Sequence, residues 1–190
     1  VLITELVLGN PDAVEILNFS GQAVELQGWK VRWFGYDNSN NPVDGDIILP
    51  SFPLNHDQRT YVEDTTEGTG GPPQVVDQHI KADVNIWWGL IPGAVVLIHP
   101  SGIPVDFVRW EGNDYDPPPG TNWTDDPDLL PGLYRDWWTL SRTPETADTD
   151  TAGDFCVTEN TLGNTNSECI QVVDKGAVWI NEIDVGNPDR

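Results

Sequence analysis

The clearest structural signal in the sequence is the stretch at residues 94–110, AVVLIHPSGIPVDFVRW. Two apolar runs, 95–98 and 105–110, flank Pro100-Ser101-Gly102-Ile103-Pro104, whose Pro and Gly residues favour a tight turn. Apolar runs joined by such a turn are typical of a β-hairpin. The stretch therefore predicts two paired strands, and its surroundings should supply the rest of a sheet.

Further strands are indicated on the N-terminal side of this hairpin. Residues 1–7, 14–17, 24–33 and 59–63 are short and rich in Val, Ile and aromatic residues, and Gly28 permits a kink within the third segment. The chain has 18 Gly and 16 Pro, which divide it into short pieces, and helical periodicity is missing almost everywhere. An all-β sandwich or partly closed barrel is expected, with long Pro-, Gly- and Thr-rich surface loops at 64–78 and 111–131.

Length and charge restrict the classes of function. A chain of 190 residues is the size of about one domain, and 31 acidic against 9 basic residues give it a net charge of −22. Such a surface repels nucleic acid and anionic lipid, and no apolar run approaches the roughly 18 residues that a membrane span needs. We expect neither nucleic acid binding nor membrane insertion. Calcium, cationic surfaces, or like-charged copies packed with counter-ions are compatible partners.

The chain contains two cysteines, Cys156 and Cys169, in a polar stretch. A local pair of this spacing favours a disulfide, worth roughly 3 kcal/mol, over two free thiols. A disulfide indicates an oxidising compartment, and so an extracellular or cell-surface location. The chain begins at Val1 and contains no methionine, which is typical of a processed or excised piece.

An internal echo is the most informative feature. VLITELVLGNPD at 1–12 reappears as VWINEIDVGNPD at 178–189, each residue lying 177 positions after its counterpart. A repeat of this period predicts tandem domains. We expect residues 1–177 to form one domain, and 178–190 to be the first strand of a following repeat or a strand that links subunits. The residues of this assembly strand are Val178, Trp179, Ile180, Ile183 and Val185. The alternative is two similar strands within one domain.

Several of these segments resemble a known family. Ile3-Thr4-Glu5, Asn10-Pro11-Asp12, 14–18 and 24–31 resemble the opening of a lamin-tail domain in its bacterial and archaeal secreted form. Residues 92–98 and 105–110 resemble its closing hairpin, and Leu140-Ser141-Arg142-Thr143-Pro144 the segment that often follows. The resemblance implies an immunoglobulin-like β-sandwich with scaffolding or adhesive use and no catalytic residues. The loop at 111–136 is longer and more aromatic than the family pattern.

Candidate sites for chemistry are sparse. His56, His79 and His99 are scattered outside any catalytic motif, so we expect no enzyme and no required cofactor. Calcium is the one cofactor that the sequence suggests. Asp37, Ser39, Asn41, Asp44 and Asp46 could wrap oxygen ligands around it, although Pro42 stands where an EF-hand loop has glycine. Solvated acidic turns are the competing interpretation.

Two further features concern sugars. Asn122-Trp123-Thr124 and Asn18-Phe19-Ser20 are sequons for N-linked glycans, and Asn18 could equally be a turn residue. The chain has 9 Trp, and the adjacent residues of Trp87-Trp88 and Trp137-Trp138 cannot both point inward from a strand. Exposed tryptophans stack on sugar rings or fill the pockets of partners.

Two functions from different classes follow. The first is a structural repeat unit of an extracellular array or filament, linked head to tail to copies of itself through the terminal strand, by covalent tandem domains or by strand exchange. The alternative is a carbohydrate-binding or adhesive surface module, with or without the help of calcium.

Overall fold

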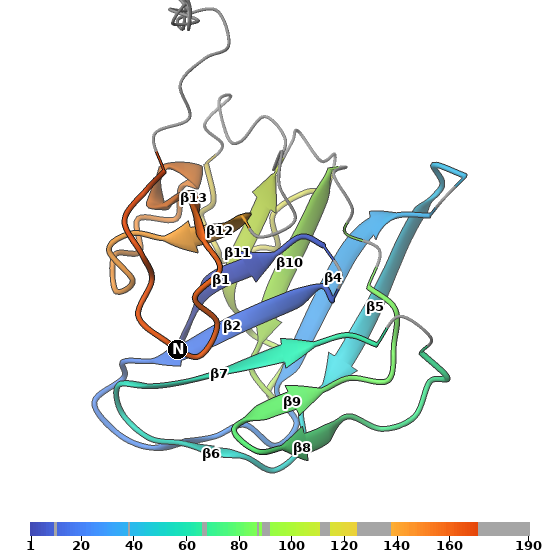
Figure 1. Ribbon diagram of the computed structural model, residues 1–190, viewed down its shortest axis with the longest axis horizontal. Helices are drawn as coiled ribbons and strands as arrows, with labels where there is room; N and C mark the ends of the chain where they lie inside the picture. Colours follow the sequence, from blue (N-terminus) through green and yellow to red (C-terminus); the bar gives the residue numbers. More distant parts are fainter. Residues whose placement is uncertain are drawn as a thin grey trace, which may run out of the picture.

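The computed structural model describes residues 1–170, except 10, 38, 66–67, 87, 89–91, 111–114 and 125–137. This part of the chain is an all-β sandwich, as the sequence predicts (Figure 1). A seven-stranded sheet has the order β13-β12-β1-β2-β7-β9-β8, and a four-stranded sheet has the order β11-β10-β4-β5. In Figure 1 the strands of the first sheet cross those of the second.

The strand bounds are as follows. The seven-stranded sheet contains β1 (Leu2–Val7), β2 (Ala13–Asn18), β7 (Gln58–Glu63), β8 (Gln74–Val76), β9 (His79–Lys81), β12 (Trp138–Arg142) and β13 (Phe155–Glu159). The four-stranded sheet contains β4 (Lys30–Tyr36), β5 (Pro42–Ile48), β10 (Gly93–Ile98) and β11 (Pro104–Trp110). A small third sheet pairs β3 (Val24–Glu25) with β6 (Pro53–Leu54), and η1 (Ala152–Asp154) is a 3-10 turn.

The predicted hairpin is confirmed, because β10 and β11 pair antiparallel around a turn in which Gly102 has φ 86°. The expected strand at 24–33 is split into β3 and β4. Gly28, with φ 78°, makes the turn between them, and its N–H donates to the carbonyl of Leu49 at 3.0 Å. Beyond this turn Trp29 is buried in the core.

The core lies between the two large sheets. Along β4, buried and partly exposed side chains alternate, as they do in a strand with one face toward the core. In β4, Val31 and Trp33 point inward, while Lys30 and Arg32 are partly exposed. The ring of Trp33 lies against Gly45 of β5, where a Cβ would come within 2.8 Å of it. A glycine on the neighbouring strand therefore provides the space for this tryptophan.

The two stretches expected to be surface loops are more structured than predicted. Residues 64–78 contain β8, which pairs with β9 at the edge of the seven-stranded sheet. The described part of the second stretch packs on the outer face of the four-stranded sheet. There Tyr115 stacks on Phe34 at 3.4 Å between ring centroids, and Trp123 meets Phe107 edge to face at 5.5 Å. Aromatic residues in this stretch thus form a third layer.

A buried ion pair joins the two large sheets. Arg142 of β12 is 0% exposed, and its Nη2 donates to both carboxylate oxygens of Asp106 on β11, at 3.1 and 3.0 Å. Burial raises the pKa of Asp106 to about 6, which is still below neutral pH, so the pair is charged there. Asp148 and Asp154 accept from Nη1 of the same guanidinium at 3.1 and 3.2 Å.

Replacing Arg142 with methionine should strongly destabilise the fold, because it leaves Asp106 buried without its cation. We expect the free energy of unfolding to fall by about 3–5 kcal/mol in urea denaturation. The control is Arg32→Met, which breaks a partly exposed pair with Asp46 and should cost about 1 kcal/mol or less. Equal losses in the two variants would contradict a special role for Arg142.

Candidate assembly site around strand β1

Strand β1 is the element that the C-terminal sequence repeats, and it is an interior strand of the seven-stranded sheet, third in its order. It pairs with β12 on one side and with β2 on the other, and Ile3 and Leu6 point into the core with 0% exposure. The pairing with β2 shifts between Ile3 and Glu5, which is a β-bulge. Such a shift frees backbone groups from the ladder.

The Arg142–Asp106 pair binds the backbone at this bulge. The N–H of Ile3 donates to Oδ2 of Asp106 at 2.7 Å, and the carbonyl of Ile3 accepts from Nε of Arg142 at 2.9 Å. The ion pair between the sheets therefore also satisfies the peptide groups that the irregular pairing releases.

The other face of β1 carries a carboxylate that the fold buries. Glu5 lies opposite Glu15 of β2, and both side chains are 0% exposed. Thr161 donates its N–H and its hydroxyl to Glu5 at 2.8 and 2.7 Å, and Gly163 donates its N–H to Glu15 at 2.7 Å. Burial raises the pKa of Glu15 to about 7 and also raises that of Glu5. The 160–166 segment therefore covers these two carboxyl groups.

A predicted disulfide holds this covering segment. Cys156 and Cys169 are bonded with an S–S distance of 2.08 Å, which confirms the prediction. The bond closes the loop that contains residues 160–166, and Ile170 then donates its N–H to the carbonyl of Val157 on β13 at 2.7 Å. The disulfide and the Glu5 and Glu15 contacts thus fix the same segment over β1 and β2.

A second pair of buried carboxyl groups lies where β2 begins. Asp12 accepts from the N–H groups of Gly9 and Trp88 at 2.7 and 3.2 Å, and Asp64 accepts from those of Asp12 and Ile86 at 3.0 and 2.9 Å. Burial, reinforced by the charge of Asp64, raises the pKa of Asp12 to about 8. This pair joins the end of the β1–β2 hairpin to Ile86 and Trp88.

Sequence reasoning did not identify Glu5, Asp12, Glu15, Asp64 or Arg142 as a group. A signal was present in the echo, where the glutamate of β1 and the aspartate that follows it recur as Glu182 and Asp189. An acidic residue retained inside an apolar run is a reason to expect a buried role.

The five candidate calcium ligands lie at two places, with Asp37, Ser39 and Asn41 in the turn between β4 and β5, and Asp44 and Asp46 on β5 itself. Asp37 uses its Oδ1 to accept from the N–H groups of Ser39 and Asn41, each at 2.8 Å, so its carboxylate closes its own turn. Asp46 pairs with Lys30 at 2.9 Å and with Arg32, while Asp44 is exposed on the same strand. Within the described ranges, no group of three or more His, Cys, Asp or Glu residues is placed to hold a metal ion. Calcium binding stays a prediction.

The two sequons differ in their surroundings. Asn18 is 0% exposed, and its Nδ2 donates to the carbonyls of Gln22 and Leu54, each at 2.8 Å. It therefore has the turn role that the sequence offered as the alternative, and a sugar on Nδ2 would displace these bonds. Asn122 is exposed, with φ 51°, and its glycosylation stays a prediction. The assembly strand, Val178, Trp179, Ile180, Ile183 and Val185, lies outside the described residues.

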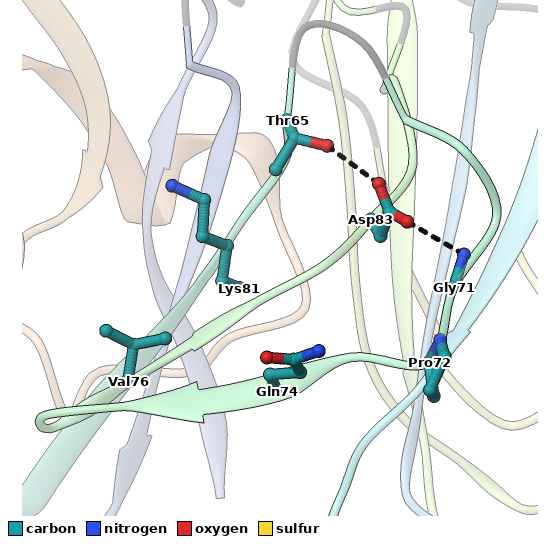
Figure 2. Close-up of a pocket in the computed structure, with 7 residues that line it drawn as sticks. All are labelled: Thr65, Gly71, Pro72, Gln74, Val76, Lys81 and Asp83. Atoms are coloured by element: carbon teal, nitrogen blue, oxygen red, sulfur yellow. Dashed lines mark hydrogen bonds between the residues drawn. The ribbon is translucent and has the colours of Figure 1, made fainter.

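A shallow hollow of about 190 Å³ lies beside β8 and β9 (Figure 2). Polar and apolar side chains line it, among them Gln74, Val76 and Lys81. Asp83 at its rim already accepts from the hydroxyl of Thr69, from the N–H groups of Thr69 and Gly71, each at 2.9 Å, and from Thr65 at 3.3 Å. These hydrogen bonds, those from Thr69 above all, lower the pKa of Asp83 to about 2. Its carboxylate is therefore engaged by the protein. Carbohydrate binding, the alternative function, stays a prediction.

Comparison with known proteins adds no family assignment. The chain matches no protein-family model and no curated protein. The likeness to lamin-tail domains therefore stays a resemblance. In the described residues no helix is long and apolar enough to span a membrane.

The raised pKa values predict that the fold loses stability as pH rises. Asp12, Glu5, Glu15 and Asp64 bind protons more tightly when folded, so their contribution is complete below about pH 4 and is lost as pH rises toward 7 or 8. Each carboxyl group changes the free energy of unfolding by at most about 1.4 kcal/mol per pH unit. We expect urea denaturation between pH 5 and 8 to show this decline.

Asp12→Asn should reduce the slope of the unfolding free energy against pH, because asparagine has no carboxyl group that binds a proton. This holds whatever the substitution does to absolute stability. Asp83→Asn serves as the control, since Asp83 titrates near pH 2 and should leave the slope between pH 5 and 8 unchanged. A wild-type protein whose stability is flat or rises across this range would disprove the assignment.

Proposed function

We propose that this chain is a structural repeat unit of an extracellular protein array or filament, with the immunoglobulin-like architecture of a lamin-tail domain. Neighbouring units are linked head to tail through residues 178–189, which take the place of β1 in the next unit. The observation that supports the proposal is that most of the buried apolar and acidic residues in and beside β1 are matched by residues of the same kind in this segment.

The core positions are preserved in kind. Ile180 corresponds to Ile3, and Ile183 corresponds to Leu6. The side chains of Ile3 and Leu6 are 0% exposed. Val185 corresponds to Leu8, which is also in the core. A strand with these residues can fill the inner face of the slot between β2 and β12.

The polar positions are preserved as well. Glu182 corresponds to Glu5, which accepts a hydrogen bond from the N–H of Thr161. Asp189 corresponds to Asp12, which accepts hydrogen bonds from the N–H groups of Gly9 and Trp88. Asn181 replaces Thr4, whose hydroxyl donates to Glu15 at 2.7 Å, and an amide can donate in its place. Asp184 stands where β1 has the buried Val7, and nothing in the structure explains that difference.

Two routes use the same equivalence. In covalent tandem domains, 178–189 begin the next domain of one chain, whereas in strand exchange they enter the sheet of a separate copy. Contacts of this heterologous kind do not close on themselves, so they produce linear assemblies. The disulfide supports an oxidising, extracellular setting for either route.

Electron microscopy of the purified full chain should show rods with a regular axial repeat. Ile180→Asp together with Ile183→Asp should abolish the rods, because a charge at either position cannot enter the core. Lys175→Ala, which lies outside the echo, is the matched control and should leave them intact. A chain that remains monodisperse and monomeric would exclude strand exchange between copies and leave only the covalent tandem route, which depends on the equivalence tested next.

The equivalence of the two segments can be tested separately with a chain that begins at Ala13 and so lacks β1. We expect residues 178–189, from the same or another copy, to restore the native fold, measured by near-ultraviolet circular dichroism of the buried tryptophans. Adding Ile180→Asp and Ile183→Asp should leave the shortened chain unfolded. If the shortened chain is unfolded without these two changes, the equivalence is wrong.

A further inference from the structure

Strand β1 is enclosed on four sides. β2 and β12 pair with it within the sheet, and Ile3 and Leu6 on its inner face pack into the core. Its outer face is covered by residues 160–166, which follow β13, lie outside any strand and loop back over β1 and β2 (Figure 1). We call these seven residues the clasp. A strand can therefore enter or leave the position of β1 without separating the two large sheets only when the clasp is lifted.

The clasp holds β1 through polar contacts. Thr161 donates its N–H and its hydroxyl to Glu5 of β1. Nδ2 of Asn166 donates to the carbonyl of Thr4 on β1 at 2.9 Å and to that of Arg142 on β12 at 3.0 Å. The structure describes every residue of the clasp, and none of them belongs to the hydrophobic core. A segment without core side chains opens more readily than the strands beneath it, so its closure depends on how its ends are held.

The two ends of the clasp are held differently. The first end continues directly from β13, so the chain itself tethers it. Beyond the second end, the bond from Cys169 to Cys156 ties the chain back to β13, together with the hydrogen bond from Ile170 to Val157. Small reagents can reach this disulfide, because Cys169 is exposed and Cys156 is half-buried. Opening the disulfide leaves the clasp with one covalent tether in place of two.

We propose that the Cys156–Cys169 bond is a lock, which closes the clasp over whichever strand fills the slot between β2 and β12. This inference rests on the proposed function, in which residues 178–189 fill that slot in the next unit. The linking strand enters while the two thiols are free and the clasp can open. Oxidation then ties the clasp down over the inserted strand, with Glu182 in the place of Glu5. The lock makes the head-to-tail link resistant to dissociation.

A small-molecule disulfide is the oxidant for this step. The exposed thiolate of Cys169 attacks it and expels one thiol, and the thiolate of Cys156 then attacks the mixed disulfide and expels the second. The two cysteines lose two electrons, which the reagent gains, and the two cysteine protons end on the two released thiols. The reverse exchange with an excess of a dithiol opens the lock, and the dithiol becomes a cyclic disulfide.

Amide hydrogen exchange followed by mass spectrometry tests the lock in the full chain carrying Ile180→Asp and Ile183→Asp, in which the terminal segment cannot compete with β1. Adding a dithiol should speed exchange in β1 at least about tenfold, because the closed loop no longer restrains the clasp. Exchange in β4 and β10 of the other sheet should stay unchanged. The matched variant, Cys156→Ser with Cys169→Ser, should exchange fast in β1 with or without the dithiol.

Two results of this measurement would overturn the proposal. The first is exchange in β1 that does not change on reduction, since the clasp would then close without the disulfide. The second is equal acceleration in β1, β4 and β10, because the disulfide would then stabilise the whole sandwich and not a local clasp.

A labelled peptide of residues 178–189 separates this inference from the proposed function. The same chain should take up the peptide at least about tenfold faster when reduced than when oxidised, and reoxidation with oxidised glutathione should retain the peptide through gel filtration. Uptake at equal rates in both states would overturn the lock and support the head-to-tail link. Faster exchange in β1 on reduction without any uptake of the peptide would support the lock and contradict the link.

Discussion

The buried guanidinium of Arg142 is the constraint on which the rest of the sandwich depends. Each of its nitrogens donates to a buried acceptor, among them Asp106 on the facing sheet and the carbonyl of Ile3 on β1. A cation at this depth is tolerated only when such partners are complete. The relative position of the sheets, the bulge in β1 and the approach of the 147–154 segment are therefore fixed together, because a shift of any one leaves a buried charge without a partner.

This constraint restricts the register in which β1 can pair with its neighbours. A purely apolar strand can pair in several registers, whereas β1 must also place Glu5 beneath Thr161 and its Ile3 peptide groups against the Arg142–Asp106 pair. A slip by one residue would turn Glu5 into the core and Leu6 toward the carboxylates. Buried polar groups of this kind favour one register, which is the property that a strand linking identical units needs.

The sequence predicted the parts of the fold that local patterns determine. The hairpin at 94–110, the β1 and β2 strands and the Cys156–Cys169 bond all depend on alternation, turn residues or short separation. It did not predict the burial of Glu5 or Asp12, because their donors lie at Thr161 and Trp88, far along the chain. Strand β8 was missed for a related reason, since its pairing with β9 arises within a polar, proline-rich stretch.

The distribution of charge bears on how such acidic units pack. Buried carboxyl groups with raised pKa values, such as Asp12 and Glu15, carry less than a full charge near neutral pH, so the net charge is less negative than the formal value of −22. At physiological ionic strength the remaining charges act over about 8 Å. Repulsion between neighbouring copies is then decided by the groups within that distance of the contact. Lys30 and Arg32 of β4 both pair with Asp46 of β5, so this part of the four-stranded sheet adds little to that repulsion, although the molecule as a whole is strongly negative.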